Sequence, residues 1–408
     1  MTDHPTLSLQ FPGMQTPSAL DCVATGHYPA GSVRRPKVDT AAEPIRDLAF
    51  DMIRILDDAG KAVGEWAADL PEVDLLAGLR HMMTLRAYDT RMLMAQRQGK
   101  TSFYMQHRGE EAISCAFQRV LAPGDMNFPT YRQAGLLIAA GYPLINMMCQ
   151  VYSNDGDAAR GRQLPVFYSA RSHGFFSISG NLATQYVQAV GWAMASALRG
   201  DKGIAAAWVG DGATAESDFH AALVFASTYR APVVLNIVNN QWAISTFESI
   251  ARGGAATFAA RGHGFGIPSL RVDGNDYLAV LAVAHWACER ARRNLGPTLI
   301  EYVTYRASGH SSSDDPSAYR PKEAHRDWPL GDPIERLKTH LILRGLWSEE
   351  RHTQAEVEIL ATVMEAQKKA EAIGTLHAGH HPPLLDMFTD VYEEMPAHLR
   401  RQLQEAEA

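Results

Sequence analysis

Two apolar segments that are typical of buried strands each run into a polar side chain. IAAAWVG (204–210) leads into Asp211, which is flanked by glycines, and VVLNIV (233–238) leads to Asn240. Because ligands of a parallel sheet bind beyond the carboxyl ends of its strands, we expect both side chains at one binding edge. A carboxylate and a carboxamide oxygen suit Mg²⁺ that completes its shell with a diphosphate and water. The pattern predicts a magnesium site formed by Asp211, Asn240 and the backbone carbonyl of Trp242.

The residues around Asp211 also favour an anion. The glycines on both sides are expected to let the backbone approach a phosphate closely. A helix expected after Gly212 would turn its positive N-terminal end toward that phosphate. A Gly-Asp-Gly turn alone is most often only a turn, but a second polar strand end follows 29 residues later across a β-α-β unit. That joint occurrence favours a binding site.

The elements that must position these residues are those of an α/β fold. The apolar runs at 204–210, 233–239 and 297–305 are continuous, as a parallel sheet with helices on both faces requires. Apolar residues recur at helical spacing in 45–58 and 355–372, among other stretches, which predicts helices there. The predicted organisation is an extended N-terminal arm over 1–45, a helical lead-in over 46–100, a mainly parallel α/β domain over 101–345 and a helical extension over 346–408.

Composition excludes several classes of function. The 408 residues are 46% hydrophobic and 20% charged, with a net charge of −7, which argues against a nucleic-acid surface. No segment approaches the roughly 18 uninterrupted apolar residues of a membrane span. The first residues lack a basic start and an apolar core, so a cytoplasmic location is expected. Four scattered cysteines indicate reduced, mostly buried thiols.

Several longer motifs make the interpretation specific. They are SFYMQHRGEEA (102–112), PTYRQAG (129–135), GRQLPVFYSA (161–170), SGNLATQ (179–185) and GHSSSDDPSAYR (309–320). With the Asp211 and Asn240 pair, which resembles a thiamin-diphosphate motif, the chain resembles the alpha subunits of branched-chain 2-oxo acid dehydrogenases over about 45–390. The resemblance implies a thiamin-diphosphate-binding fold. It also implies oxidative decarboxylation of 3-methyl-2-oxobutanoate and related acids in valine, leucine and isoleucine degradation.

The resemblance also assigns roles to individual residues. It places Tyr131 and His310 at the cofactor's reacting end as catalytic groups, and Arg132 on its diphosphate. A planar guanidinium and an imidazole that titrates near neutrality suit those tasks. Further cofactor contacts are implied for Gly180, Leu182, Asp211, Gly212, Ala213 and Asn240. A monovalent-cation site, usually potassium, is implied at Ser179, Thr184 and Gln185.

Partners follow from what the chain lacks. The sequence contains no convincing second α/β module to supply the glutamate that must protonate the cofactor's pyrimidine. The resemblance implies a beta subunit that brings this glutamate, in an α2β2 heterotetramer. It also implies a lipoylated dihydrolipoyl acyltransferase as acyl acceptor. We therefore expect the chain alone to be inactive.

Two departures from the animal members of the family bear on the site. Val238 replaces an arginine, which removes one phosphate contact, and Gly180 replaces a serine, which leaves a roomier pocket. Three alternatives stay open at this point. They are a pyruvate or acetoin dehydrogenase alpha subunit, a Mg²⁺-dependent phosphohydrolase with an aspartyl acceptor, and a non-enzymatic scaffold.

Overall fold

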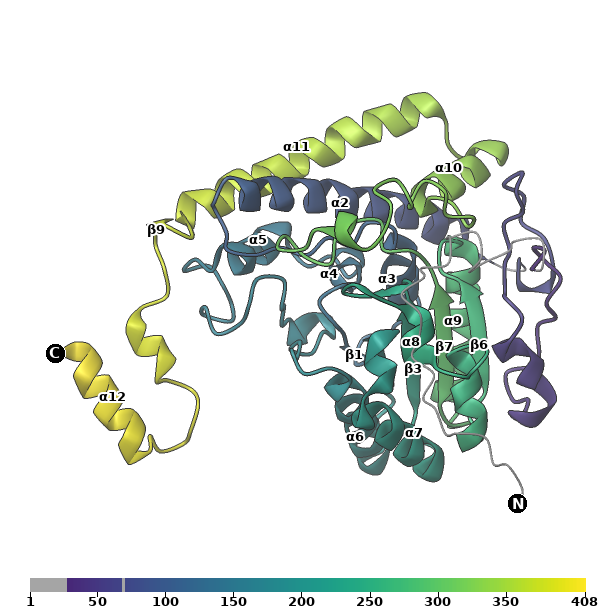
Figure 1. Cartoon of the computed structure of the whole chain (residues 1–408), viewed down its shortest axis with the longest axis horizontal. Coiled ribbons are helices and arrows are strands. Elements are labelled where there is room, and N and C mark those ends of the chain that lie inside the picture. The colour runs from purple at the N-terminus through teal and green to yellow at the C-terminus, as the bar shows by residue number, and fades with distance from the viewer. Residues whose placement is uncertain (1–27, 68–69) are drawn as a thin grey trace, which may run out of the picture.

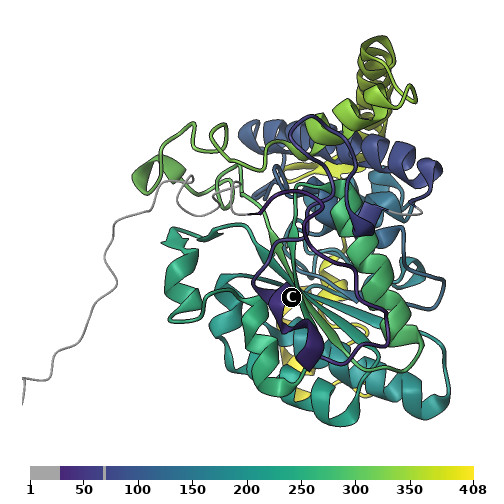
Figure 2. The same cartoon turned by 90° about the vertical axis from the view of Figure 1, so that its right-hand side faces the viewer.

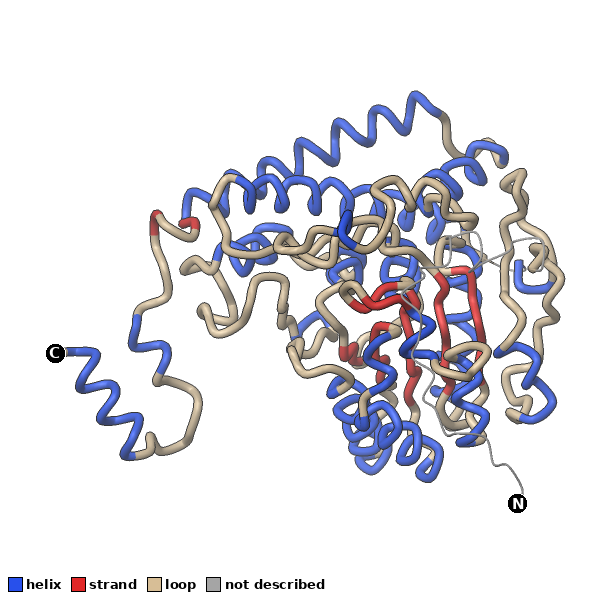
Figure 3. The backbone as a smooth tube through the Cα atoms, viewed as in Figure 1, coloured by secondary structure: helices blue, strands red, loops and turns tan. Residues whose placement is uncertain are grey.

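A five-stranded parallel sheet forms the centre of the molecule (Figure 1; Figure 3). The computed structural model describes residues 28–67 and 70–408. In spatial order the strands are β1 (Met126–Phe128), β2 (Ala205–Gly210), β3 (Val233–Asn239), β7 (Thr298–Val303) and β6 (Ser269–Asp273). All neighbouring pairs are parallel. The predicted mainly parallel α/β fold is confirmed, and β2, β3 and β7 coincide with the three apolar runs.

Helices cover both faces of this sheet (Figure 2). The helices concerned are α6 (Thr184–Arg199) and α7 (Ser217–Tyr229) on one face, and α3 (Glu111–Gln118) and α9 (Tyr277–Arg292) on the other, with α2 (Glu72–Arg97) packed behind these. Alternate residues of β3 enter the two cores: Leu235 and Ile237 pack toward α6 and α7, whereas Val234 and Val238 pack toward α3 and α9. Because side chains alternate along a strand, a sheet covered on both faces needs this continuous apolar character.

The remaining elements connect or extend these layers. They are α4 (Ala134–Ala139), α5 (Leu144–Tyr152), α8 (Glu248–Arg252), α10 (Pro333–Leu343), α11 (Glu349–Ile373), α12 (Ala397–Glu407), the hairpin β4 (Trp242–Ala243) with β5 (Thr246–Phe247), and the hairpin β8 (Gly374–Thr375) with β9 (Ala378–Gly379). No helix in the described parts of the chain has the length and apolarity needed to cross a bilayer. Cys115, Cys149 and Cys288 are buried free thiols, as expected, and Cys22 lies outside the described residues.

The segment over 45–58 corrects the sequence prediction. Its apolar spacing predicts a helix, but only a 3₁₀ helix, η2 (Glu43–Ala49), forms, and the chain then runs extended beside β6. Ile53 donates its N–H to the carbonyl of Arg271 at 2.9 Å. The Asp276 carboxylate accepts the N–H groups of Ile55 and Leu56, at 2.8 and 2.6 Å. These hydrogen bonds use backbone groups that a helix would need, so tertiary pairing overrides the local pattern.

The C-terminal region is helical, as predicted. The helix expected over 355–372 forms as α11, which lies along α2 (Figure 1). Ile359 and Val363 are buried beneath it. Farther on, α12 stands away from the body of the molecule (Figure 1). The polar stretch between β7 and α10 contains only the short 3₁₀ turn η7 (Pro316–Ala318), in agreement with its composition.

Candidate active site

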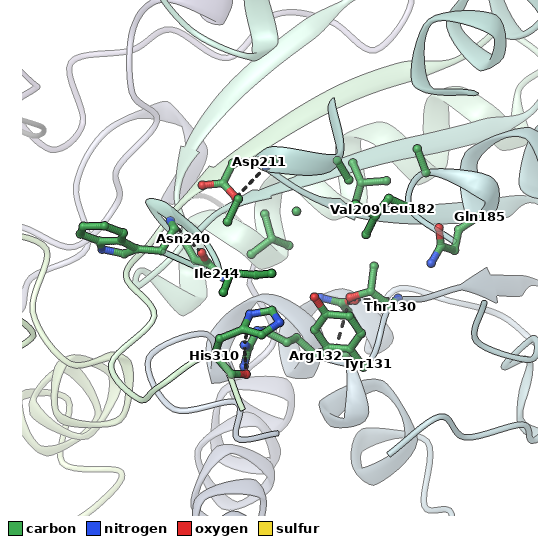
Figure 4. Close-up of a pocket in the computed structure, with 18 of the residues that line it drawn as sticks. Thr130, Tyr131, Arg132, Leu182, Gln185, Val209, Asp211, Asn240, Ile244 and His310 are labelled. Carbon is green, nitrogen blue, oxygen red and sulfur yellow. Dashed lines mark hydrogen bonds between the residues drawn. The ribbon is translucent and has the colours of Figure 1, made fainter. Parts of the chain in front are cut away.

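A cavity of ≈ 370 Å³ opens at the carboxyl ends of β2 and β3. Two groups of side chains face each other across it in Figure 4: Asp211 and Asn240 on one side, and Tyr131, Arg132 and His310 on the other. Of the residues predicted from the sequence, the cavity is lined by Tyr131, Arg132, Ser179, Gly180, Leu182, Gln185, Asp211, Gly212, Ala213, Asn240, Trp242 and His310. Thr184 lies behind this wall, with its hydroxyl 3.1 Å from that of Ser179.

Asp211 presents a buried oxygen that lacks a partner. Its side chain is 2% exposed, and Oδ1 accepts the N–H of Gly212 at 2.9 Å. Oδ2 has no hydrogen-bond partner among the described residues. Burial, with smaller contributions from Glu248 and Glu110, raises the pKa of Asp211 to about 7. A buried carboxylate oxygen without a partner is costly, so the site is suited to a bound cation.

Asn240 and Trp242 complete an oxygen-rich corner beside Asp211. Asn240 donates from Nδ2 to Glu110 Oε1 at 2.7 Å, and its Oδ1 accepts the N–H of Trp242 at 3.2 Å. The Trp242 carbonyl accepts one hydrogen bond from Arg306 Nη1 at 3.1 Å. A carbonyl has two lone pairs, so one remains for another partner. This all-oxygen donor set fits a hard cation such as Mg²⁺.

The structure gives Gly212 a reason to be glycine besides the expected approach of a phosphate, which stays a prediction for both glycines. A Cβ on Gly212 would stand 2.4 Å from the Cβ of Ala243, so glycine is required for the close approach of the β4–β5 hairpin. A Cβ on Gly210 would meet open space. The helix does not begin at Gly212 either, because the 3₁₀ turn η5 (Gly212–Ala215) precedes α7. The predicted helix end is therefore separated from Asp211 by one short turn.

Arg132 supplies positive charge on the opposite side of the cavity. It is 5% exposed and donates to the carbonyls of Gln106 and His310, the latter at 2.5 Å. Its guanidinium lies 5.6 Å from the centre of the Tyr131 ring, which itself stacks on Phe167 at 6.0 Å. These contacts hold the Arg132 guanidinium at the cavity, where it can bind an anionic group of a ligand.

His310 is held as a neutral imidazole by its surroundings in the protein. Burial, Arg132 and Arg306 lower the pKa of His310 to about 3. Its Nδ1 lies 3.4 Å from Arg132 Nη2, which can only donate, so the ring proton belongs on Nε2. The backbone N–H of His310 donates to Asp314 Oδ2 at 2.6 Å, and Asp314 in turn accepts from the Tyr319 hydroxyl. The ring is thus positioned as a hydrogen-bond donor to a ligand.

The lowered pKa of His310 predicts a pH-dependent stability. Because the folded-state pKa lies below the ordinary value, the contribution is present above pH 6.5 and is lost progressively as the pH falls toward 3. We expect the unfolding temperature of the cofactor-free protein to fall less between pH 7.5 and pH 5 in His310→Gln than in the wild type. Replacing the exposed His398 by glutamine is the matched control. Equal pH dependence of His310→Gln and the wild type, measured by differential scanning fluorimetry, would contradict this assignment.

The predicted monovalent-cation residues lie together. The hydroxyls of Ser179 and Thr184 contact each other, and Gln185 Nε2 donates to the Ser179 carbonyl at 3.3 Å. Gln185 Oε1 is buried without a partner among the described residues. Ala183, between them, has a left-handed backbone with φ 62°. An amide oxygen without a donor fits a cation, and the potassium site stays a prediction.

Leu182 and Ile244 give the cavity an apolar side. Leu182 is 53% exposed at the wall and does not belong to the core, as the resemblance implies. Ile244 is 56% exposed at the hairpin tip and has φ 55°, which is strained for a β-branched residue. Arg306 holds this conformation by donating to the Ile244 carbonyl at 2.7 Å. An exposed apolar residue in a strained conformation beside a cavity indicates a ligand contact that sequence reasoning missed.

Two further groups were also missed. Glu110 is 3% exposed and lines the cavity between Arg132 and Asn240. Behind it, His107 Nδ1 lies 2.8 Å from Asp89 Oδ1, and its Nε2 lies 3.1 Å from the Tyr131 carbonyl. The only sequence signal was that Glu110 and His107 lie within the motif at 102–112. Their partners are distant in the chain, so the contacts could not be inferred from spacing.

Comparison with known proteins agrees with the geometry. Residues 79–379 match the family model described as the dehydrogenase E1 component. The chain is 58% identical to the 2-oxoisovalerate dehydrogenase subunit alpha of Pseudomonas aeruginosa, over 99% of each chain. It is 40% identical to the mitochondrial subunit alpha of Mus musculus, over 86% of this chain and 78% of that protein. It is 36% identical to the mitochondrial subunit alpha 2 of Arabidopsis thaliana, over 92% of this chain and 78% of that protein. The chain therefore belongs to the dehydrogenase E1 component family, whose members depend on thiamin diphosphate.

Proposed function

We propose that this protein is the alpha subunit of a 2-oxoisovalerate dehydrogenase. In this role it takes part in the oxidative decarboxylation of 3-methyl-2-oxobutanoate and related branched-chain 2-oxo acids, and the acyl group passes to the lipoyl group of a dihydrolipoyl acyltransferase. The observation that carries the proposal is Asp211 Oδ2, which has no partner in the part of the chain that the structure describes and lies beside the carboxamide of Asn240, in a cavity with Arg132 opposite. The names of the similar proteins support the substrate class.

The residues of the cavity divide the task of holding the cofactor. Asp211, Asn240 and the Trp242 carbonyl would hold Mg²⁺, and the cation would neutralise part of the diphosphate charge. Arg132 would bind the diphosphate through its fixed N–H groups, and His310 would donate from Nε2. Ser179, Thr184 and Gln185 would hold potassium and stiffen the turn before α6.

When bound, thiamin diphosphate supplies an electron sink for the bond to the departing carboxylate. The chain's own share is to orient the reacting end and to exclude water from it. Tyr131 is fixed between Phe167 and His310, at ring distances of 6.0 Å on each side. Leu182 and Ile244 place apolar surface at the cavity mouth. A dry site strengthens the electrostatic contacts to the ligand.

The subunit role implies a beta subunit as partner. The described residues contain a single parallel α/β sheet, which would carry the residues that hold the diphosphate. We propose that the beta subunit covers the cavity, brings the glutamate that contacts the pyrimidine, and forms an α2β2 heterotetramer with this chain. The half-exposed apolar residues at the cavity mouth would become buried in that assembly.

Substrate choice provides the test of the proposed function. We expect kcat/KM of the complex with its beta subunit to be at least ~10-fold higher for 3-methyl-2-oxobutanoate than for pyruvate, because a pocket discriminates by about 10-fold or more per missing methylene. The substrate 2-oxobutanoate should fall between them. Reduction of an artificial electron acceptor measures all three rates. A preference for pyruvate would instead support the pyruvate or acetoin dehydrogenase alternative.

A further inference from the structure

Glu110 is a buried carboxylate in the cavity that the roles described above do not use. It occupies the position before the first residue of α3, yet its side chain caps no N–H group of that helix. It is 3% exposed and is directed to the cavity wall formed with Asn240 and Arg132. A buried glutamate is unusual unless it is paired, so its contacts need an explanation.

The main contact of Glu110 is with Asn240. Glu110 Oε1 lies 2.7 Å from Asn240 Nδ2, within hydrogen-bond distance. Its approach to Arg132 Nε is longer, at 3.9 Å, and Arg132 donates to two backbone carbonyls instead. The hydrogen bond to the Asn240 carboxamide is therefore the closer of these two contacts of the Glu110 carboxylate.

This contact determines which way the carboxamide of Asn240 faces. The two ends of a carboxamide have nearly the same shape, so packing alone selects weakly between them. When Glu110 is ionised it only accepts hydrogen bonds, so only the NH₂ end of the carboxamide can face it. The oxygen end then accepts the N–H of Trp242 and lies on the side of the proposed metal ligands. With the opposite orientation the amide would present hydrogens to a cation.

Glu110 also adds a second unpartnered oxygen to the cavity. Its Oε2 is buried and has no hydrogen-bond partner among the described residues, as is the case for Asp211 Oδ2. Glu110 also contributes to the raised pKa of Asp211, so the two carboxylates repel each other, and a cation bound at Asp211 would reduce that repulsion. Both observations place Glu110 close to the proposed metal ligands Asp211 and Asn240.

We propose that Glu110 is a positioning residue. It fixes the Asn240 carboxamide so that the amide oxygen faces the divalent cation. The inference rests on the proposed function, since it requires that Asp211 and Asn240 hold a cation. Residues that orient metal ligands typically change metal affinity by about 10- to 100-fold when they are removed. Glu110 is assigned no contact with the substrate.

The test measures Mg²⁺ binding separately from turnover. The chain is co-purified with its beta subunit, thiamin diphosphate is held at saturation, and Mg²⁺ is titrated while tryptophan fluorescence is recorded. In Glu110→Ala and Glu110→Met, which lack the acceptor, we expect the Mg²⁺ midpoint to rise at least ~10-fold. In Glu110→Gln, whose amide oxygen can still accept from Asn240, we expect a rise of no more than about 3-fold. Glu110→Met retains the side-chain volume and serves where the alanine variant does not fold.

The matched control is Glu248→Gln. Glu248 is 7% exposed and close enough to raise the pKa of Asp211, but it pairs with Arg252 and lies outside the cavity wall. We expect its Mg²⁺ midpoint to equal that of the wild type. Equal losses in Glu110→Gln and Glu110→Met would show that charge alone matters and would overturn the orienting role.

A double variant isolates the coupling to Asn240. If Glu110 acts through Asn240, adding Glu110→Ala to Asn240→Ala should raise the Mg²⁺ midpoint by less than about 2-fold further. Fully multiplicative effects of the two substitutions would refute the proposal. Unchanged binding in Glu110→Met would refute it as well. Absence of Mg²⁺-dependent binding in the wild type would instead refute the proposed function, so the two failures are distinguishable.

Discussion

Replacing Asp211 by alanine is expected to weaken Mg²⁺-dependent binding of thiamin diphosphate at least ~100-fold, since the proposed carboxylate ligand to the metal is lost. Isothermal titration calorimetry on the complex with the beta subunit measures this effect. The conservative variant Asp211→Glu should retain most of the affinity, because it keeps a carboxylate at the strand end. Tight binding in Asp211→Ala would contradict the metal assignment.

The variant Asp211→Asn separates loss of binding from loss of folding. Burial raises the pKa of Asp211 to about 7, so the stability associated with its proton is lost as the pH rises through that value. At pH 8 the ionised side chain destabilises the cofactor-free protein, and the neutral amide removes this cost. We expect Asp211→Asn to weaken cofactor binding as well, because the ligand charge is lost, and to unfold at a higher temperature than the wild type at pH 8. A lower unfolding temperature would show that the carboxylate is needed for the fold itself.

Purified without its beta subunit, the chain is expected to retain less than ~1% of the activity of the reconstituted complex. The physical reason is that in the proposed site the cavity residues would bind the diphosphate end and the metal, while pyrimidine activation needs a further acid that is worth about 100-fold or more. The measurement is decarboxylation of 3-methyl-2-oxobutanoate with an artificial electron acceptor. Adding the beta subunit to the same sample should restore activity, which serves as the control for an intact alpha chain. Full turnover by the single chain would contradict the shared site.

The central part of the fold and most of the candidate site could be predicted from the sequence. β2 and β3 are buried on both faces, so apart from Asn236 and the terminal Asn239 of β3 their residues are apolar or glycine, and the polar residues that follow the strands stand out. The short strand β1 and the strand β6, which contains the charged Arg271, carry no such signal. Residues 45–58 have helical spacing, but hydrogen bonds to β6 and to Asp276 draw them into an extended path.

The missed parts of the site depend on contacts between distant segments. Glu110 is 130 residues from Asn240 in the chain, and no spacing rule connects them. The need for glycine at 212 arises from the side chain of Ala243, which lies in the β4–β5 hairpin. The strained conformation of Ile244 depends on Arg306, 62 residues later. Sequence patterns report local periodicity, whereas these features appear only after the chain has closed on itself.

The three proposed metal ligands lie within one continuous stretch of the chain, from Asp211 to Trp242, which begins directly after β2 and contains η5, α7 and β3. By contrast, Arg132 and His310, which face them, are 178 residues apart in sequence. Closing a short stretch costs less chain entropy than bringing remote segments together. The three proposed metal ligands can therefore be brought together by local folding. Arg132 and His310, the proposed diphosphate contacts, meet only when the whole domain is assembled. Partial unfolding at the loop that carries His310 would release the anion first and leave the cation ligands in place.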